Sequence, residues 1–190
     1  MNKDNTYILW KVNGLITKAE IIEQPYSGQF KERIYGISNS WNSQDCTWIK
    51  FEDENYNEWC GQFEGAHQAV ALSSKHNKIL VATFDYLFQI DCVSGEMTDY
   101  EPTNTYKDLT VTPFGDFIIA DYYHIEIIRE SINDRKLLDI PIQMDMIKFN
   151  GWSENKLSIS CEELGVVDSK VELELDATTF EINILSRIYK

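Results

Sequence analysis

Residues 70–91 constrain the fold more than any other stretch of the chain. They hold three short apolar runs, rich in β-branched and aromatic residues, which are separated by the turn-forming segments 73–78 and 83–85. Runs this short, bounded by turn formers, predict β-strands rather than helices. A fourth strand is expected at residues 96–100, after Gly95, which can take the positive φ of a tight turn.

The same four-strand pattern comes back twice. It returns about 38 residues further along at 108–112, 116–121, 124–129 and 135–140, and again at 144–149, 156–160, 171–176 and 180–184. Asp91 and Asp176 each end a strand, and Glu96 and Glu181 each open the next one. A single four-stranded meander cannot bury both of its faces, so we expect consecutive units to stack face to face.

This repeat resembles the blades of β-propellers in general, over roughly residues 30–184. The chain lacks the Gly-His and Trp-Asp dipeptides of WD40 repeats, so the pattern indicates no named propeller family. The resemblance implies an all-β fold: a propeller-like array of about four small antiparallel sheets, either an open half-propeller or a small closed propeller.

We expect the 190 residues to form a single domain. Residues 1–32 are predicted to be an N-terminal hairpin and loop, with strands at 7–12 and 15–22 joined through Asn13-Gly14, a strong signal for a type I′ turn. Residues 33–184 would hold about four blade-like repeats, of which 33–63 is a degraded first one. No segment keeps the apolar spacing of a helix over three turns.

The net charge of −14 limits the partners of the chain. It opposes binding to nucleic acid and to anionic membranes, because both need Lys or Arg to replace condensed cations. It favours a basic protein, which it would attract over long range, although solubility alone also explains it. No apolar run approaches the ~20 residues of a membrane span, and residues 1–6 have no apolar core of a signal peptide, so we expect a cytoplasmic protein.

The sequence predicts no metal site, no cofactor and no disulfide framework. Cys46, Cys60, Cys92 and Cys161 have no zinc-type spacing; they read as reduced thiols, with one disulfide as the alternative. Asp53, Asn55, Asn57 and Glu64 fit positions one, three, five and twelve of a calcium loop. Glu58 stands where that loop requires Gly, so we expect a solvated hairpin turn instead.

An acidic and aromatic surface is the strongest functional signal. Propeller geometry places the loops between second and third strands, and the connections between repeats, on one side of the molecule. The candidate partner-binding residues on these loops are Phe84, Asp85, Tyr86, Asp121, Tyr122, Tyr123, His124, Glu162 and Glu163. Aromatic rings provide rigid contact area and carboxylates select a cationic partner. The alternative is that the rings plug gaps between the sheets.

We therefore expect a non-enzymatic protein-binding module for a basic protein. Its small size and acidity are similar to those of bacterial immunity proteins, which inhibit a basic toxin by covering its active site. A second hypothesis is an enzyme in the propeller mouth that uses His67 and His124 with Asp121, although no nucleophile stands in a strained elbow motif. A third is a structural subunit of a larger assembly, such as a half-propeller completed by pairing.

Overall fold

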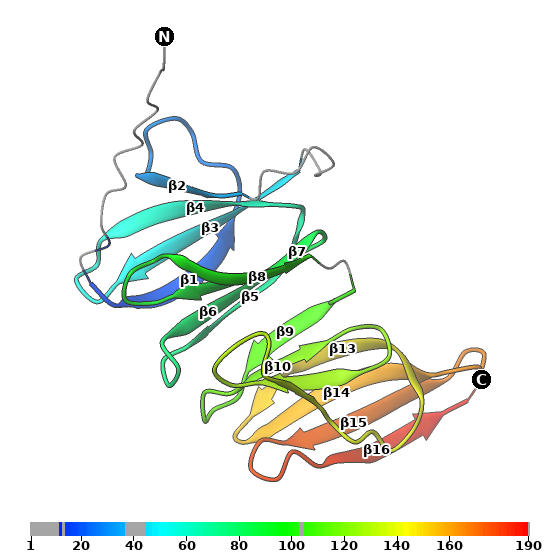
Figure 1. Ribbon diagram of the computed structural model, residues 1–190. Helices are drawn as coiled ribbons and strands as arrows, with labels where there is room; N and C mark the ends of the chain where they lie inside the picture. The colour runs from blue at the N-terminus through cyan, green and yellow to red at the C-terminus, as the bar shows by residue number, and fades with distance from the viewer. Residues whose placement is uncertain (1–11, 13, 37–44, 103–104, 190) are drawn as a thin grey trace.

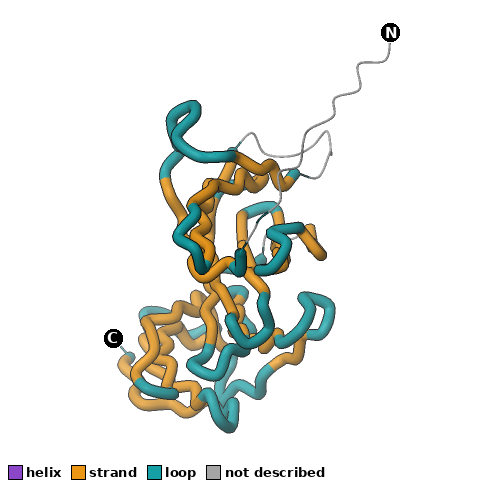
Figure 2. Tube along the Cα trace, turned by 90° about the vertical axis from the view of Figure 1, so that its left-hand side faces the viewer, coloured by secondary structure: helices purple, strands orange, loops and turns teal. Residues whose placement is uncertain are grey.

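The computed structural model describes residues 12, 14–36, 45–102 and 105–189. Over these ranges the chain forms sixteen strands and no helix, arranged in four sheets of four strands (Figures 1 and 2). The all-β class and the number of sheets predicted from the repeat are confirmed. In the described ranges nothing helical is long and apolar enough to cross a membrane.

The first sheet differs from the predicted repeat. Its strands are β1 (Ile16–Ile22), β2 (Glu32–Tyr35), β3 (Cys46–Asp53) and β4 (Glu58–Glu64), in the order β1-β3-β4-β2. The sheet thus starts at residue 16 rather than at 33, because β1 pairs with β3. In addition, β2 runs parallel to β4, which a simple meander does not allow. The predicted strand 7–12 lies, apart from residue 12, outside the described residues.

The other three sheets are antiparallel meanders in chain order. The second contains β5 (His67–Ser73), β6 (Lys78–Thr83), β7 (Tyr86–Asp91) and β8 (Met97–Pro102). The third contains β9 (Asp108–Val111), β10 (Phe117–Ala120), β11 (Ile125–Ile128) and β12 (Arg135–Leu137). The fourth contains β13 (Met144–Ser153), β14 (Lys156–Glu163), β15 (Lys170–Asp176) and β16 (Ile182–Ile188).

The sheets stack face to face through three core clusters. Ile79 and Phe88 of the second sheet pack with Phe51 and Phe63 of the first. The next residue on β6, Leu80, packs instead with the third sheet, in a cluster that includes Phe117 and Ile119. A third cluster joins Ile118 and its neighbours to the fourth sheet. The second and third sheets are therefore covered on both faces, which explains why adjacent residues of β6, β7 and β10 are buried in succession.

The first strands of the sheets lie innermost in the array. β5 contacts β1 on one side and β9 on the other, and β9 also contacts β13. The first and fourth sheets share no core cluster among the described residues, and each carries paired charged side chains on its outward face. Lys50 bridges Glu20 and Glu58 on one of these faces, and Lys156 bridges Glu174 and Asp176 on the other. The first and fourth sheets thus form the two ends of an open array (Figure 1), and both ends carry ion pairs on their outer faces.

Polar contacts lock neighbouring sheets together at the end that carries the β5–β6 and β9–β10 turns. Arg33 and Tyr35 of the first sheet both donate hydrogen bonds to the Gly95 carbonyl, over 2.6 and 2.5 Å. Asp116 of the third sheet lies 2.7 Å from Lys75 Nζ and 2.8 Å from His76 Nε2 of the second. The polar side chains named above at this end of the array therefore hold neighbouring sheets together.

Candidate functional site

The opposite end of the array carries the loops on which the candidate residues were predicted. Strand register places the loops of each sheet there: His67 pairs with Thr83, Asp108 with Ala120, and Met144 with Glu163. The loop face is defined here as the described residues of the segments 64–67, 83–86, 101–107, 121–124, 140–144 and 162–169. Each sheet from the second to the fourth contributes to it.

A lysine connects the loops of the second and third sheets. Lys107 Nζ lies 5.0 Å from the ring centroid of Phe84 and 4.9 Å from that of Tyr122, so it faces both rings at cation–π distance. Phe84 is 46% exposed and Tyr122 38%. The rings therefore remain accessible at the surface while the ammonium group holds them together, and they do not merely plug the gap between the sheets.

Asp121 orders its own loop. Its Oδ1 accepts hydrogen bonds from the backbone N–H groups of Tyr123 and His124, both over 2.6 Å, and its Oδ2 lies 3.3 Å from His124 Nδ1. This is the local bonding that favours Asp in tight turns. It presents Tyr122 and Tyr123 outward, with ring centroids 6.1 Å apart.

A small pocket joins this loop to the fourth sheet. Its volume is about 330 Å³, and its lining consists of Tyr123, His124, Ile140, Gln143, Met144 and Leu164. The Leu164 N–H donates to the Gln143 carbonyl over 2.9 Å, which fixes the two segments of the fourth-sheet side against each other. The loops of the second, third and fourth sheets thus adjoin one another in turn.

Not every predicted residue presents its side chain to solvent. Tyr86 is only 4% exposed and belongs to the core between the first and second sheets. Asp85 turns toward Gly65, where an added Cβ would lie 2.9 Å from its Oδ2. That oxygen is buried and has no hydrogen-bond partner within the described part of the chain. The Tyr86 side chain and the Asp85 Oδ2 atom therefore pack inside the protein and are not exposed on the loop face.

Glu162 and Glu163 are strand residues, whereas the sequence analysis placed them in a loop. The alternation of buried Leu157, Ile159 and Cys161 continues to the end of β14, so the loop comprises residues 164–169. Glu162 is exposed. Glu163 Oε2 accepts a hydrogen bond from the Tyr189 hydroxyl over 3.0 Å and lies 3.9 Å from an Arg187 guanidinium nitrogen.

Two histidines that were predicted as a possible catalytic pair lie in separate clefts. His67 lines a cleft of about 770 Å³ with residues 21–24, 45–48 and 62. His124 lines the small pocket of the third and fourth sheets, and the two clefts share no residue. The geometry gives no support to joint catalysis by His67, His124 and Asp121.

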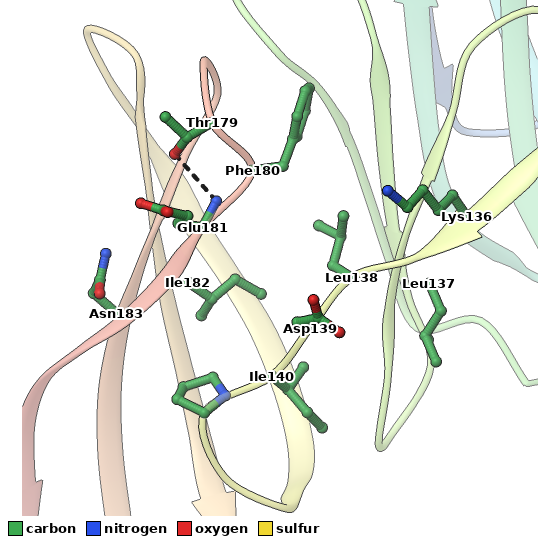
Figure 3. A pocket seen from close by; sticks show the side chains of 11 residues that line it. Lys136, Leu137, Leu138, Asp139, Ile140, Thr179, Phe180, Glu181, Ile182 and Asn183 are labelled. Atoms are coloured by element: carbon green, nitrogen blue, oxygen red, sulfur yellow. Dashed lines mark hydrogen bonds between the residues drawn. The ribbon is translucent and has the colours of Figure 1, made fainter.

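A further groove lies at the outer edge of the third and fourth sheets. It has a volume of about 470 Å³ and runs between residues 136–141 and 179–183 (Figure 3). Its two walls come from the end of β12 and the start of β16. Leu138 and Ile182 form part of the buried core there, at 6% and 7% exposure. This groove meets the loop face at Ile140 and Pro141, and its other lining residues lie outside that face.

The calcium-loop residues form an ordinary capped turn. Asp53 Oδ1 accepts hydrogen bonds from the N–H groups of Asn55 and Asn57, and Oδ2 accepts one from the Asn57 side chain. Burial alone would raise the pKa of Asp53, but these hydrogen bonds outweigh it and lower that pKa. No group of three or more potential ligands that could hold a metal occurs within the ranges that the structure describes.

All four cysteines are free thiols, so the disulfide alternative is wrong for this structure. Cys60, Cys92 and Cys161 are buried and Cys46 is exposed. Burial raises the pKa of Cys60 to about 11 and that of Cys92 to about 12, which keeps both groups protonated and unreactive near neutral pH.

Sequence reasoning missed several residues of the loop face. Lys107 lies in the connection between the second and third sheets, and its contact with the rings of Phe84 and Tyr122 depends on how these sheets stack. Leu164, Val166 and Val167 form an exposed apolar run at 44%, 37% and 84% exposure. The sequence signal that could have identified this run is three apolar residues around Gly165, directly after Glu162 and Glu163.

Comparisons with known proteins find similarity in structure only. No protein-family model and no curated protein matches the sequence. Among solved structures, the chain is similar to a protein of unknown function from Bacteroides caccae, at 10% identity and a TM-score of 0.49 over 76% of this chain and 60% of that one. It is also similar to the WD40 domain of SCAP from fission yeast, at 10% identity and a TM-score of 0.42 over 91% and 48%.

A third similar structure is the N-terminal domain of Nup159, at 8% identity and a TM-score of 0.44 over 65% of this chain and 34% of that one. The chain thus spans between 34% and 60% of the length of these three structures.

Proposed function

We propose that this chain is a non-enzymatic binding module that takes a basic protein on its loop face. The observation that carries the proposal is that exposed Phe84, Tyr122 and Tyr123 share the loop face with Asp121, which follows β10, and with the acids that end β14. Exposed aromatic rings of this kind are enriched where proteins dock, because they bury a large area at little cost in conformational entropy.

The charge of the chain supports a cationic partner. At −14 for 190 residues, the chain attracts basic proteins and repels nucleic acid and anionic membrane surfaces. On the loop face, Asp121 and Glu162 add negative charge, and Lys107, which lies against two of the rings, offsets part of it. The polar groups at the other end of the array are already used between sheets, as with Asp116 and Lys75.

The more specific form of the proposal is an immunity protein that inhibits a basic toxin. Carboxylates of the loop face would pair with Lys or Arg side chains that the toxin uses on its own substrate, and the rings would fill the space around them. Occlusion of this kind needs no catalytic group in the inhibitor.

A capture experiment with matched variants tests the proposal. The double variant Tyr123→Ala/Glu162→Lys alters the loop face, and Phe114→Ala/Asp134→Lys makes the same changes on exposed turns at the other end. We expect proteins from the source cells to be retained by the wild type and by the second variant, but at least about tenfold less by the first. Retention should also fall between about 0.1 M and about 1 M salt, as the Debye length shrinks from ~10 to ~3 Å. Retention that is the same at both salt concentrations and in the loop-face variant would contradict the proposal.

A further inference from the structure

The small pocket between the third and fourth sheets is well placed to receive one large apolar side chain. Its volume of about 330 Å³ lies at the lower end of the range for small-molecule sites, ~300–1,000 Å³. Four of the six lining side chains are apolar or aromatic: Tyr123, Ile140, Met144 and Leu164. Met144 is 1% exposed and anchors the floor in the core.

The pocket lining includes exposed apolar surface. Tyr123 is 45% exposed and Leu164 44%, and Val167, in the same loop as Leu164, is 84% exposed. A partner that covered these side chains would remove apolar area from water around the central pocket. A buried anchor surrounded by contacts that exclude water is the arrangement in which a few residues dominate the energy of an interface.

The charges around the pocket select its occupant. Asp121 precedes the two pocket residues of the third sheet, and Glu163 precedes Leu164 on the fourth, with Glu162 next to it on the outward face of β14. Two cations of this region are already engaged: Arg187 lies 3.9 Å from Glu163, and Lys107 lies against the rings of Phe84 and Tyr122. An apolar anchor with basic neighbours therefore fits, whereas a second copy of this chain would bring a further net charge of −14.

From these observations we propose that the pocket is the anchor site for an aromatic side chain in a basic segment of the partner. This inference rests on the proposed function and specifies which part of the loop face dominates binding. The partner segment would place its ring against Leu164 and Tyr123, and its flanking Lys or Arg side chains beside Asp121 and Glu162.

Peptide titrations of the full ¹⁵N-labelled chain test the anchor. The probes are Lys-Lys-Trp-Lys-Lys, Lys-Lys-Ala-Lys-Lys and Glu-Glu-Trp-Glu-Glu, each blocked at both ends. We expect the first to shift the amide signals of Tyr123, His124 and Leu164, the second to bind at least about tenfold more weakly, and the third not to bind. Leu164→Ser should weaken the first peptide at least about fivefold, whereas Val93→Ser, also exposed, should leave it unchanged.

Two results would overturn the anchor. If the Trp and Ala peptides bind equally and shift residues 83–86 and 121–124, the acidic face binds cations but has no apolar anchor, so the proposed function survives alone. If the Trp peptide instead shifts Leu138 and Ile182, the ring enters the outer groove of Figure 3 rather than this pocket.

Discussion

Two neighbouring residues of β6 test the stacking of the sheets. Ile79 and Leu80 are both 0% exposed, yet Ile79 packs toward the first sheet and Leu80 toward the third. Because successive side chains of a strand point to opposite faces, both can be buried only if the second sheet is covered on both sides. Ile79→Ala and Leu80→Ala each remove the same number of carbon atoms from a close-packed core.

Each truncation should lower the free energy of unfolding by about 2–5 kcal/mol, the usual cost of a large-to-Ala change in a core. The matched control is Leu137→Ala in β12, where the side chain is 54% exposed and the expected cost is below about 0.5 kcal/mol. Urea unfolding followed by tryptophan fluorescence measures all three values. If either Ile79→Ala or Leu80→Ala behaved like the control, one face of the second sheet would be solvated and the stacked array would be wrong.

Three further outcomes follow from local geometry. Lys156 and the Thr178 N–H lower the pKa of Asp176 to about 2, so the stability that Asp176→Asn removes should be present above about pH 4 and disappear as the pH falls toward 2, as seen in thermal melts across that range. A thiol reagent should modify one cysteine of the native protein, the exposed Cys46, and all four in denaturant; rapid native labelling of Cys60 or Cys92 would contradict their burial. Gly61→Ala should cost about 1–3 kcal/mol in urea unfolding, because its Cβ would lie within 2.9 Å of the rings of Phe51, Phe63 and Tyr35; a neutral change would show that these rings can move apart.

The repeat made the fold predictable because its signals are local. Short apolar runs and turn residues recur with one spacing, so the strands of the second and third sheets could be located from the sequence. Adjacent buried residues such as Ile118 and Ile119 also carry the information that a sheet is covered on both faces.

The first sheet was harder to predict, because its pairing is not local. The residues of β1 pair with residues of β3 that lie 26 to 37 positions further along the chain, and β2 joins β4 in parallel; neither partner can be recognised from turn chemistry. The end of β14 was misplaced for a simpler reason: Glu162 and Glu163 resemble loop residues, although they continue the alternation of a strand whose outer face is polar.

The site could be predicted only as a set of loops at one end. The sequence showed that acids and rings follow the second strands of the repeats, but it did not show which side chains face inward. Tyr86 is buried because it begins β7 within the core, and Asp85 turns toward Gly65. Lys107 approaches Phe84 and Tyr122 only once the second and third sheets are stacked.

Hydrogen exchange of the chain, free and bound to the basic protein that it captures, tests the loop face most directly. We expect binding to slow exchange in residues 83–86, 121–124, 140–144 and 164–169, and to leave the turns 73–78 and 112–117 unchanged. Protection confined to those two turns, or to the outward face of the first or fourth sheet, would contradict the assignment of the loop face as the binding surface.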